Sequence, residues 1–164
     1  MPDQADPIAY FITWTTYGTW LPGDERGWYA KPGIWSPGDA KMQRWSELLM
    51  TEDAFVMDRA QRAVVEGAIR QHCQYRGWLF HAVNARSNHV HVIVTATEVD
   101  PDVVLTQFKA RCTRNLREAY PELVHRAHHW TENGSKRRVY SEPALQDLMC
   151  YVVEQQDGAR FTTG

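Results

Sequence analysis

Two strand-like runs occupy the middle of the chain, and only a short turn separates them. Residues 78–85 and 89–96 are rich in β-branched and aromatic side chains, and Arg86-Ser87-Asn88 lies between them. Runs of this kind joined by so short a connection form antiparallel hairpins. The chain is therefore expected to fold around an antiparallel sheet that contains this hairpin.

A helix is expected on each side of the hairpin. Before it, apolar residues recur at helical spacing from about Thr51, and Gly77 ends the pattern. After it, Pro101 opens a stretch in which apolar residues return every four positions as far as Leu116. Each helix has one apolar face, which it can bury against the sheet.

Further strands are expected near both ends of the chain. Residues 8–17 (IAYFITWTTY) have the composition of a strand, and residues 128–140 suggest two short strands around a turn. Pro143 begins a last helix that runs through about Gln156. The order βαββαβ with an added C-terminal helix predicts the α+β class and a ferredoxin-like antiparallel sheet with two helices on one face. The other face is left free for a site.

Residues 18–45 are expected to form a long loop without helix or sheet, because glycines and prolines recur throughout this segment. Trp20, Trp28 and Trp35 within it can stack on unpaired bases or clasp the loop to the sheet. The clasp is the preferred interpretation for most of them. Loops of this length are usually functional or disordered.

Length and composition favour one domain that stays in the cytoplasm. The chain has 164 residues, of which 43% are hydrophobic and 23% charged, close to the average of globular proteins. Its apolar runs are far shorter than a membrane span, and its three cysteines suit reduced thiols better than a disulfide framework. We therefore expect a single cytoplasmic domain over residues 1–164, with no membrane partner.

Positive charge is concentrated in the middle of the chain, although the net charge is −2. Residues 59–118 carry 9 basic and 5 acidic residues, whereas residues 1–58 carry 4 and 9. An acidic total can therefore hide a basic face that follows a nucleic-acid backbone, although a solvated helix face explains the helical arginines equally well. The candidates for such contacts are Arg111, Arg114, Arg117, Lys136, Arg137 and Arg138.

His89-Val90-His91 is the sharpest chemical signal. Alternate residues of a strand point to one face about 6.6 Å apart, so both imidazoles can converge on one ion. Gln155 is a candidate third ligand, because it shares a helix face with Tyr151 four residues earlier. Two imidazoles and one hard oxygen suit Mg²⁺ or Mn²⁺ better than a closed zinc site. Surface histidines and an ordinary amphipathic helix remain the alternative.

Three motifs together resemble a known family. They are His89-Val90-His91 within SNHVHVIV, a first strand that ends TTYGTW, and Tyr151 followed four residues later by Gln155. In this order they resemble the single-tyrosine HUH transposases, which are the insertion-sequence-200 type enzymes and their REP-associated relatives. The resemblance covers most of the chain. It implies that both histidines and the glutamine bind a divalent metal, and that Tyr151 is the nucleophile.

The function implied is nicking and rejoining of single-stranded or hairpin DNA. A phenol with a pKa near 10 needs help to attack a phosphodiester, and a bound metal gives that help. The products would be a 5′-phosphotyrosine bond and a free 3′-OH, and resealing would need no ATP. Trp20 and the basic residues would contact the DNA. The last helix can serve its own subunit or a neighbour, so monomer and homodimer both remain open.

Two other functions are compatible with the same residues. A domesticated protein could bind hairpin DNA without cutting it, and would not depend on Tyr151. A metal-dependent phosphodiester hydrolase could use the histidines with water and form no covalent intermediate. A covalent adduct between protein and DNA that requires Tyr151 distinguishes the expected enzyme from both.

Overall fold

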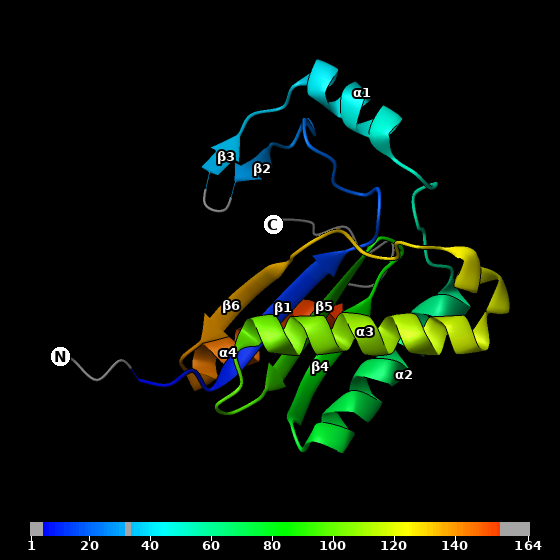
Figure 1. Ribbon diagram of the computed structural model, residues 1–164. Helices are drawn as coiled ribbons and strands as arrows, with labels where there is room; N and C mark the ends of the chain where they lie inside the picture. Colours follow the sequence, from blue (N-terminus) through cyan, green and yellow to red (C-terminus); the bar gives the residue numbers. More distant parts are fainter. Residues whose placement is uncertain (1–4, 32–33, 155–164) are drawn as a thin grey trace.

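A four-stranded antiparallel sheet forms the centre of the computed structural model, which describes residues 5–31 and 34–154 (Figure 1). The strands lie in the order β4 (Leu79–Ala85), β5 (His89–Thr95), β1 (Ala9–Thr15) and β6 (Ser135–Val139). The predicted hairpin is β4 and β5, and β1 pairs with β5 on one side and β6 on the other. The sheet confirms the α+β class and the antiparallel pairing predicted from the order of elements.

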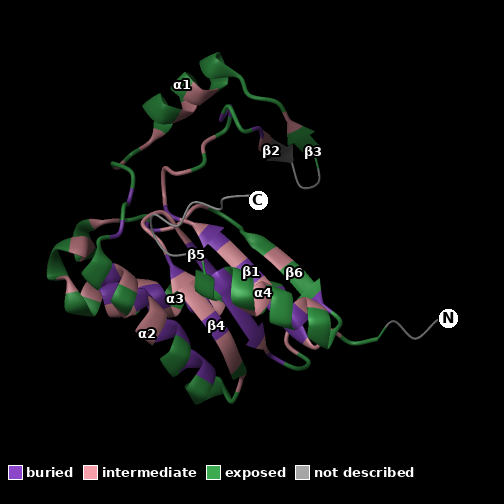
Figure 2. Ribbon diagram, turned by 180° about the vertical axis from the view of Figure 1, so that it is seen from behind, coloured by how far each residue is buried: buried purple, intermediate pink, exposed green. Residues whose placement is uncertain are grey.

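Helices cover both faces of this sheet (Figures 1 and 2). α2 (Arg59–Arg76) and α3 (Pro101–Ala119) pack together on one face, and a short 3₁₀ helix, η1 (Pro121–His125), follows α3. The C-terminal helix α4 (Glu142–Glu154) packs on the other face against β4 and β5. None of the helices in the described ranges is both long and apolar enough to cross a membrane.

α2 begins later than the sequence predicts. The expected start near Thr51 is wrong, because Asp58 caps the helix instead. The Asp58 carboxylate accepts the Gln61 backbone N–H at 2.8 Å, and the Gln61 side chain accepts the Asp58 N–H at 3.0 Å. Gly77 ends the helix as predicted, with a left-handed φ of 71°.

Residues 18–50 form a projection that we call the arm, and the prediction of a plain loop there is wrong. The arm contains the short paired strands β2 (Trp28–Lys31) and β3 (Ile34–Ser36) and the helix α1 (Ala40–Leu49). The Asp39 carboxylate caps α1. The glycines and prolines mark turns between elements too short to leave a clear periodic pattern. Figure 1 shows α1 standing apart from the sheet.

The segment before β6 is also simpler than predicted. Residues 128–140 contain one strand, β6, and a single bridge between Thr16 and Trp130. The expected second strand does not form there, because other contacts hold this stretch. The Glu52 carboxylate accepts the backbone N–H of Ala127 at 2.6 Å and of His128 at 2.8 Å. β6 pairs with β1 instead of with its neighbour in sequence.

Two apolar clusters lie on opposite faces of the sheet. The larger one, beneath α2 and α3, includes Ile12, Trp14 and Phe108, all almost fully buried. The smaller one joins Ile93 to Leu145 and Val152 of α4. Each strand therefore carries side chains into two different environments, and the α4 face is the one that the histidines of β5 share.

Candidate active site

The alternation of β5 separates its valines from its histidines. Val90, Val92 and Val94 are fully buried in the cluster beneath α2 and α3. His89 and His91 point the opposite way, toward the face that α4 covers. The predicted alternation is therefore present, and both imidazoles lie on one surface of the sheet.

Tyr151 lies beside these histidines. The ring centroids of His89 and His91 are 4.7 Å apart, and the Tyr151 ring is 6.0 Å from that of His91. α4 is held in this place partly by Asn84 on β4, whose Nδ2 donates to the Val152 carbonyl at 3.0 Å. One chain thus brings together the predicted nucleophile and both predicted imidazole ligands.

Phe11 on β1 completes this surface, and the sequence analysis did not single it out. Its ring stacks on His91 at 5.7 Å with an interplanar angle of 12°. It also meets the Tyr151 ring edge to face at 6.3 Å. The alternation of side chains expected for a strand over residues 8–17 could have indicated this position, because it places Phe11 on the face opposite Ile12.

Hydrogen bonds at Nδ1 orient both imidazoles. His91 Nδ1 lies 2.9 Å from Thr13 Oγ1, and His89 Nδ1 lies 2.8 Å from Asn88 Oδ1. With the proton on Nδ1, each ring donates to its oxygen partner and presents the Nε2 lone pair as the ligand atom. Burial, and secondarily the charge of Arg86, lowers the pKa of His89, which favours the neutral form that binds a metal.

This donor set fits two of the three ligands expected for a divalent ion. The third, Gln155, lies outside the described residues. Within residues 5–31 and 34–154, no group of three His, Cys, Asp or Glu side chains converges on a common point. The orientation of His89 and His91 is compatible with metal ligation, and metal binding by these two residues and Gln155 stays a prediction.

The arginines of α3 lie on the opposite side of the sheet from the histidines. Arg117 donates to the Arg126 carbonyl at 2.9 Å and is only partly exposed, and Arg111 is also partly buried. Arg114 is exposed and pairs with Glu118 at 3.3 Å. The structure does not bring this helix face to the predicted nucleophile, so its contact with DNA stays a prediction.

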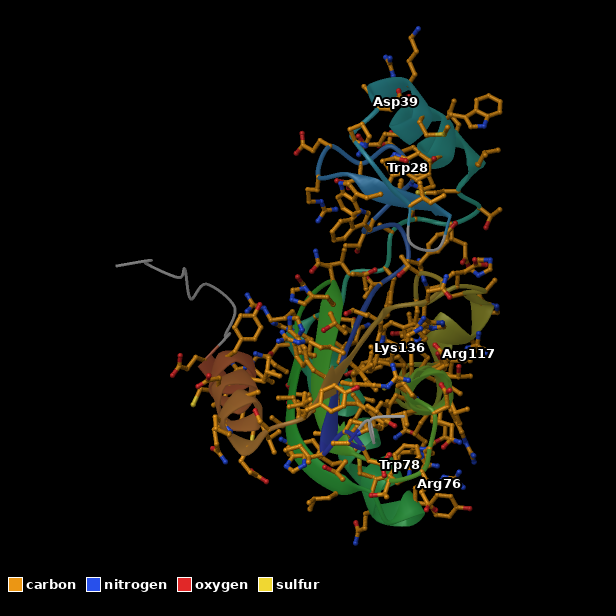
Figure 3. The ribbon with its side chains drawn as sticks, turned by 90° about the vertical axis from the view of Figure 1, so that its left-hand side faces the viewer. Trp28, Asp39, Arg76, Trp78, Arg117 and Lys136 are labelled. Carbon is orange, nitrogen blue, oxygen red and sulfur yellow. The ribbon has the colours of Figure 1, made fainter. Side chains whose placement is uncertain are left out.

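The basic residues of β6 are divided between the two faces. Lys136 is bonded to Asp102 of α3, and Arg138 stands opposite Tyr10, which is buried on the same face. Figure 3 shows Lys136 and Arg117 on the side of the sheet away from α4. Arg137 stands opposite Phe11 and so belongs to the histidine face.

Trp20, the tryptophan of the arm that is predicted to contact DNA, is in contact with several other residues of the arm. Trp20 Nε1 donates to the Gly27 carbonyl at 2.8 Å, and the Arg26 guanidinium lies 4.2 Å from the centre of the indole. Trp35 meets its ring at 6.5 Å. Trp20 therefore joins parts of the arm to one another and does not join the arm to the sheet. Its contact with DNA stays a prediction.

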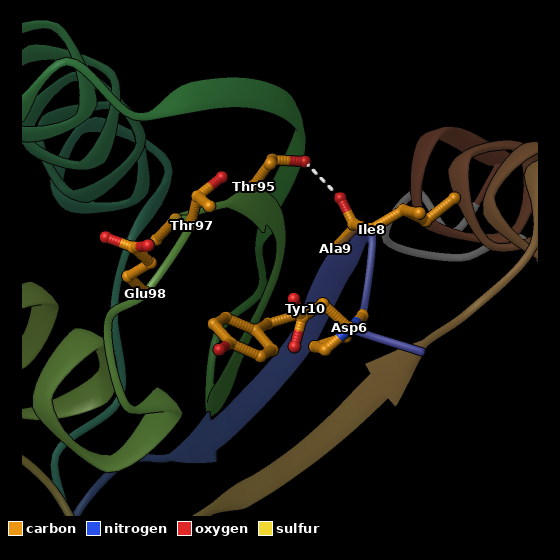
Figure 4. A pocket seen from close by; sticks show the side chains of 9 residues that line it. Asp6, Ile8, Ala9, Tyr10, Thr95, Thr97 and Glu98 are labelled. Atoms are coloured by element: carbon orange, nitrogen blue, oxygen red, sulfur yellow. Dashed lines mark hydrogen bonds between the residues drawn. The ribbon is translucent and has the colours of Figure 1, made fainter. Parts of the chain in front are cut away.

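A separate hollow of about 160 Å³ lies at the N-terminal end of β1 (Figure 4). Residues 6–10 and 95–98 line it, and the Thr95 hydroxyl donates to the Ile8 carbonyl at 2.6 Å. The histidines pair with the other end of β1, where His89 stands opposite Thr15. The hollow is therefore not part of the candidate active site.

Comparisons with known proteins identify a family and similar folds. Residues 50–155 match the family model described as "Transposase IS200 like". The crystal structure of a protein assigned as a transposase from Deinococcus radiodurans R1 is similar, with a TM-score of 0.54 and 14% identity over 95% of this chain and 96% of that one. A REP-associated tyrosine transposase bound to a REP hairpin is also similar, with a TM-score of 0.50 and 13% identity over 90% of this chain and 66% of that one. No curated protein sequence matches the chain significantly.

Proposed function

This chain belongs to the IS200-like transposase family, and from that premise we propose that it nicks and rejoins single-stranded or hairpin DNA through a covalent bond to Tyr151. The observation that carries the proposal is the placement of the Tyr151 ring 6.0 Å from His91, on the sheet face that also holds His89. A tyrosine with only a packing role has no need of two oriented imidazoles beside it.

In the proposed reaction, the Tyr151 Oη attacks the phosphorus of the scissile phosphodiester. A bond forms between Oη and phosphorus, and the bond between phosphorus and the 3′ oxygen breaks. The phenol loses its proton and the 3′ oxygen gains one, so the number of bound protons is unchanged. The result is a 5′-phosphotyrosine and a free 3′-OH. Attack by a 3′-OH on the phosphotyrosine reverses these changes and reseals the strand.

His89, His91 and Gln155 are the proposed ligands of a divalent ion, Mg²⁺ or Mn²⁺. When bound, such an ion supplies charge neutralisation at the scissile phosphate and at the leaving oxygen. Thr13 and Asn88 hold the two imidazoles in a fixed orientation, which keeps both ligand atoms on the nucleophile's side of the sheet.

The surroundings of Tyr151 support a substrate with an unpaired strand. The side chain is 38% exposed, on a helix packed across a sheet, so an attacked phosphate must come to that surface. A strand stacked and paired within a duplex cannot enter such a position easily. Because Tyr151 reaches the histidines of its own chain, the geometry supports a nucleophile that acts within one subunit, whether or not the protein forms a homodimer.

The direct test is a search for the covalent adduct. The protein is incubated with Mn²⁺ and a single-stranded hairpin oligonucleotide labelled at its 3′ end, and the products are separated under denaturing conditions. We expect a labelled protein band that Tyr151→Phe abolishes. Tyr140→Phe, which alters another exposed tyrosine, is the matched control and should retain the band.

Two results would contradict the proposal. Cleavage that persists in Tyr151→Phe without an adduct would favour the metal-dependent hydrolase. Tight hairpin binding by the unaltered protein, with neither cleavage nor adduct under Mg²⁺ or Mn²⁺, would favour the domesticated binding protein.

A further inference from the structure

The strand β6 carries three successive cations whose surroundings differ. Residues alternate between the faces of a sheet, so Lys136 and Arg138 share one face and Arg137 occupies the other. The pairing with β1 fixes which face each cation takes. Ile12 stands opposite Lys136 and Tyr10 stands opposite Arg138, and both partners are buried beneath α2 and α3. Phe11, the partner of Arg137, is packed against the cluster beneath α4.

Lys136 has a structural role on its own face. It is bonded to the carboxylate of Asp102 in the first turn of α3 and thus ties the last strand to that helix. Its charge is already compensated. Arg138 stands over Tyr10, on the side of the sheet away from the nucleophile. Neither cation is placed to meet a strand that lies along the histidine face.

Arg137 differs from both in its surroundings. It is exposed, and within residues 5–31 and 34–154 its guanidinium has no hydrogen bond or ion pair. β6 is an end strand of the sheet, and α4 packs on β4 and β5 at the other side. Among the described residues, the surface from Arg137 across Phe11 to His91 is bordered by α4 and is not covered by another element at its β6 edge.

The distances along this surface suit a short length of DNA. Directly opposite side chains in neighbouring strands have Cβ atoms about 5 Å apart, which sets Arg137 beside Phe11. His91 is two strands and two residues away, roughly 12 Å between Cα atoms from standard sheet spacings. The Phe11 ring lies between them and stacks on His91. A long arginine side chain at this edge can therefore hold a phosphate close to, but distinct from, the one attacked by Tyr151.

We propose that Arg137 is a positioning residue that binds a backbone phosphate of the single strand entering the active site, whereas Lys136 and Arg138 do not contact that strand. The inference rests on the proposed function and deepens it, because it assigns the direction from which the strand crosses the sheet. A guanidinium suits this role since it can donate two parallel hydrogen bonds to one phosphate.

The test compares Arg137→Ala with Arg138→Ala, the same change in the same strand on the opposite face. Binding of a fluorescent single-stranded oligonucleotide of mixed sequence is measured by anisotropy over a range of salt concentrations. We expect Arg137→Ala to weaken binding about tenfold and to reduce the slope of log K against log[salt] by about 0.7, which is the loss of one phosphate contact. Arg138→Ala should change affinity less than about twofold.

A second variant excludes a folding defect as the cause. Arg137→Lys keeps the charge and loses the paired donors, so we expect an intermediate affinity with an almost unchanged salt slope. The midpoint of urea unfolding should be the same in all variants, because the altered side chains are exposed. The adduct assay should show slower formation only for the variants at position 137.

The outcomes separate this inference from the proposed function. If the unaltered protein forms the Tyr151 adduct and Arg137→Ala binds and reacts like Arg138→Ala, the role of Arg137 is overturned and the proposed function stands. If the unaltered protein forms no adduct and binds no single strand, both are overturned. Equal losses in both alanine variants would also contradict the inference, because they would indicate a diffuse electrostatic effect.

Discussion

The sheet and the arm use the same kinds of residues but differ in what those residues contact. Trp14 in β1 is 1% exposed and packs against Phe108 and Trp130, whereas Trp45 in α1 is 61% exposed. All ten residues of α1 are described, and none is buried. Aromatic content alone therefore does not identify a core, because only the sheet offers these side chains a surface to pack on.

Different forces therefore shape the two regions. The arm depends on local hydrogen bonds, such as the Asp39 cap of α1 and the pairing of β2 with β3. A helix as short as α1 gains most of its stability from packing, which is small here. The sheet depends on burial, and that burial also fixes the faces of β1 and β5. The family match over residues 50–155 excludes almost the whole arm and includes both histidines and Tyr151.

Truncation of a core aromatic should produce the largest effect on stability. Phe108 is fully buried between Trp14 and Trp78. We expect Phe108→Ala to lower the free energy of unfolding by about 3–5 kcal/mol, through lost burial and a residual cavity. Chemical denaturation monitored by circular dichroism measures this change.

The matched change in the arm is Trp45→Ala, which removes an exposed indole. Its expected effect on the free energy of unfolding is within about 0.5 kcal/mol. If the two substitutions cost similar amounts, the indole of Trp45 is buried in solution and the contrast between sheet and arm fails.

Acid should weaken the junction where the arm returns to the sheet. His129 is buried against Phe55, and burial, followed by the charges of Arg117 and Arg126, lowers its pKa to about 4. The unfolded chain takes up this proton first, near its ordinary pKa of 6.5, so stability falls as the pH drops from about 6.5 to 4 and then levels off. The nearby Glu52 carboxylate opposes part of this effect. The full shift corresponds to a loss of about 3 kcal/mol from this group.

Unfolding measured from pH 7 to pH 4 in the native protein and in His129→Asn isolates this contribution. The asparagine keeps a polar side chain and carries no titrating proton. The difference in unfolding free energy between the two proteins should change over this interval. A difference that stays constant with pH would show that His129 does not hold its proton less tightly in the folded state.

Metal binding tests whether burial in the sheet also orients the active site. Thr13→Val removes the hydroxyl that is bonded to His91 Nδ1 and keeps the shape of the side chain. Loss of such an orienting partner typically lowers metal affinity 10–100-fold. Titration of Mn²⁺ by calorimetry measures the effect.

Thr95→Val is the matched control for this experiment. Thr95 lies in β5, and its hydroxyl is also bonded to an imidazole, that of His81, which is not a proposed ligand. We expect Mn²⁺ affinity to be unchanged in this variant. Equal weakening by both valines would mean that general damage to the sheet, and not the orientation of His91, is responsible.

Sequence patterns predicted the sheet better than the segments that depend on competition between local signals. The alternation of β5 is visible because burial on one face demands it, and it correctly separates Val90 from His91. The start of α2 is not visible in the same way, because Thr51 also has the sequence features of a helix cap. Asp58 is the actual cap, and it is stabilised by reciprocal hydrogen bonds with Gln61. Strand pairing beyond the local sequence was equally hidden, because β6 finds its partner in β1.

The site was predictable to a similar degree. The resemblance of motifs placed Tyr151 near the histidines, although the two lie about sixty residues apart in sequence. Phe11 escaped notice because its importance comes from stacking on His91, which only the register of β1 against β5 reveals. The register of β6 against β1 likewise decides which cation of β6 lies on the histidine face.

Removal of the whole arm should also produce only a small effect, and it tests the contrast between the arm and the sheet most directly. The arm begins and ends at nearly the same place, since Gly18 lies against Met50 and Ala54. A short Gly-Ser linker can therefore replace residues 19–49 without moving β1 away from the rest of the sheet. Because few buried contacts are lost, we expect the unfolding free energy to change by less than about 1 kcal/mol, and Mn²⁺ affinity by less than about twofold. Calorimetric unfolding and Mn²⁺ titration measure both. A larger loss of stability would show that the arm packs on the sheet in solution, and a lost metal site with a stable fold would show that it helps to orient the imidazoles.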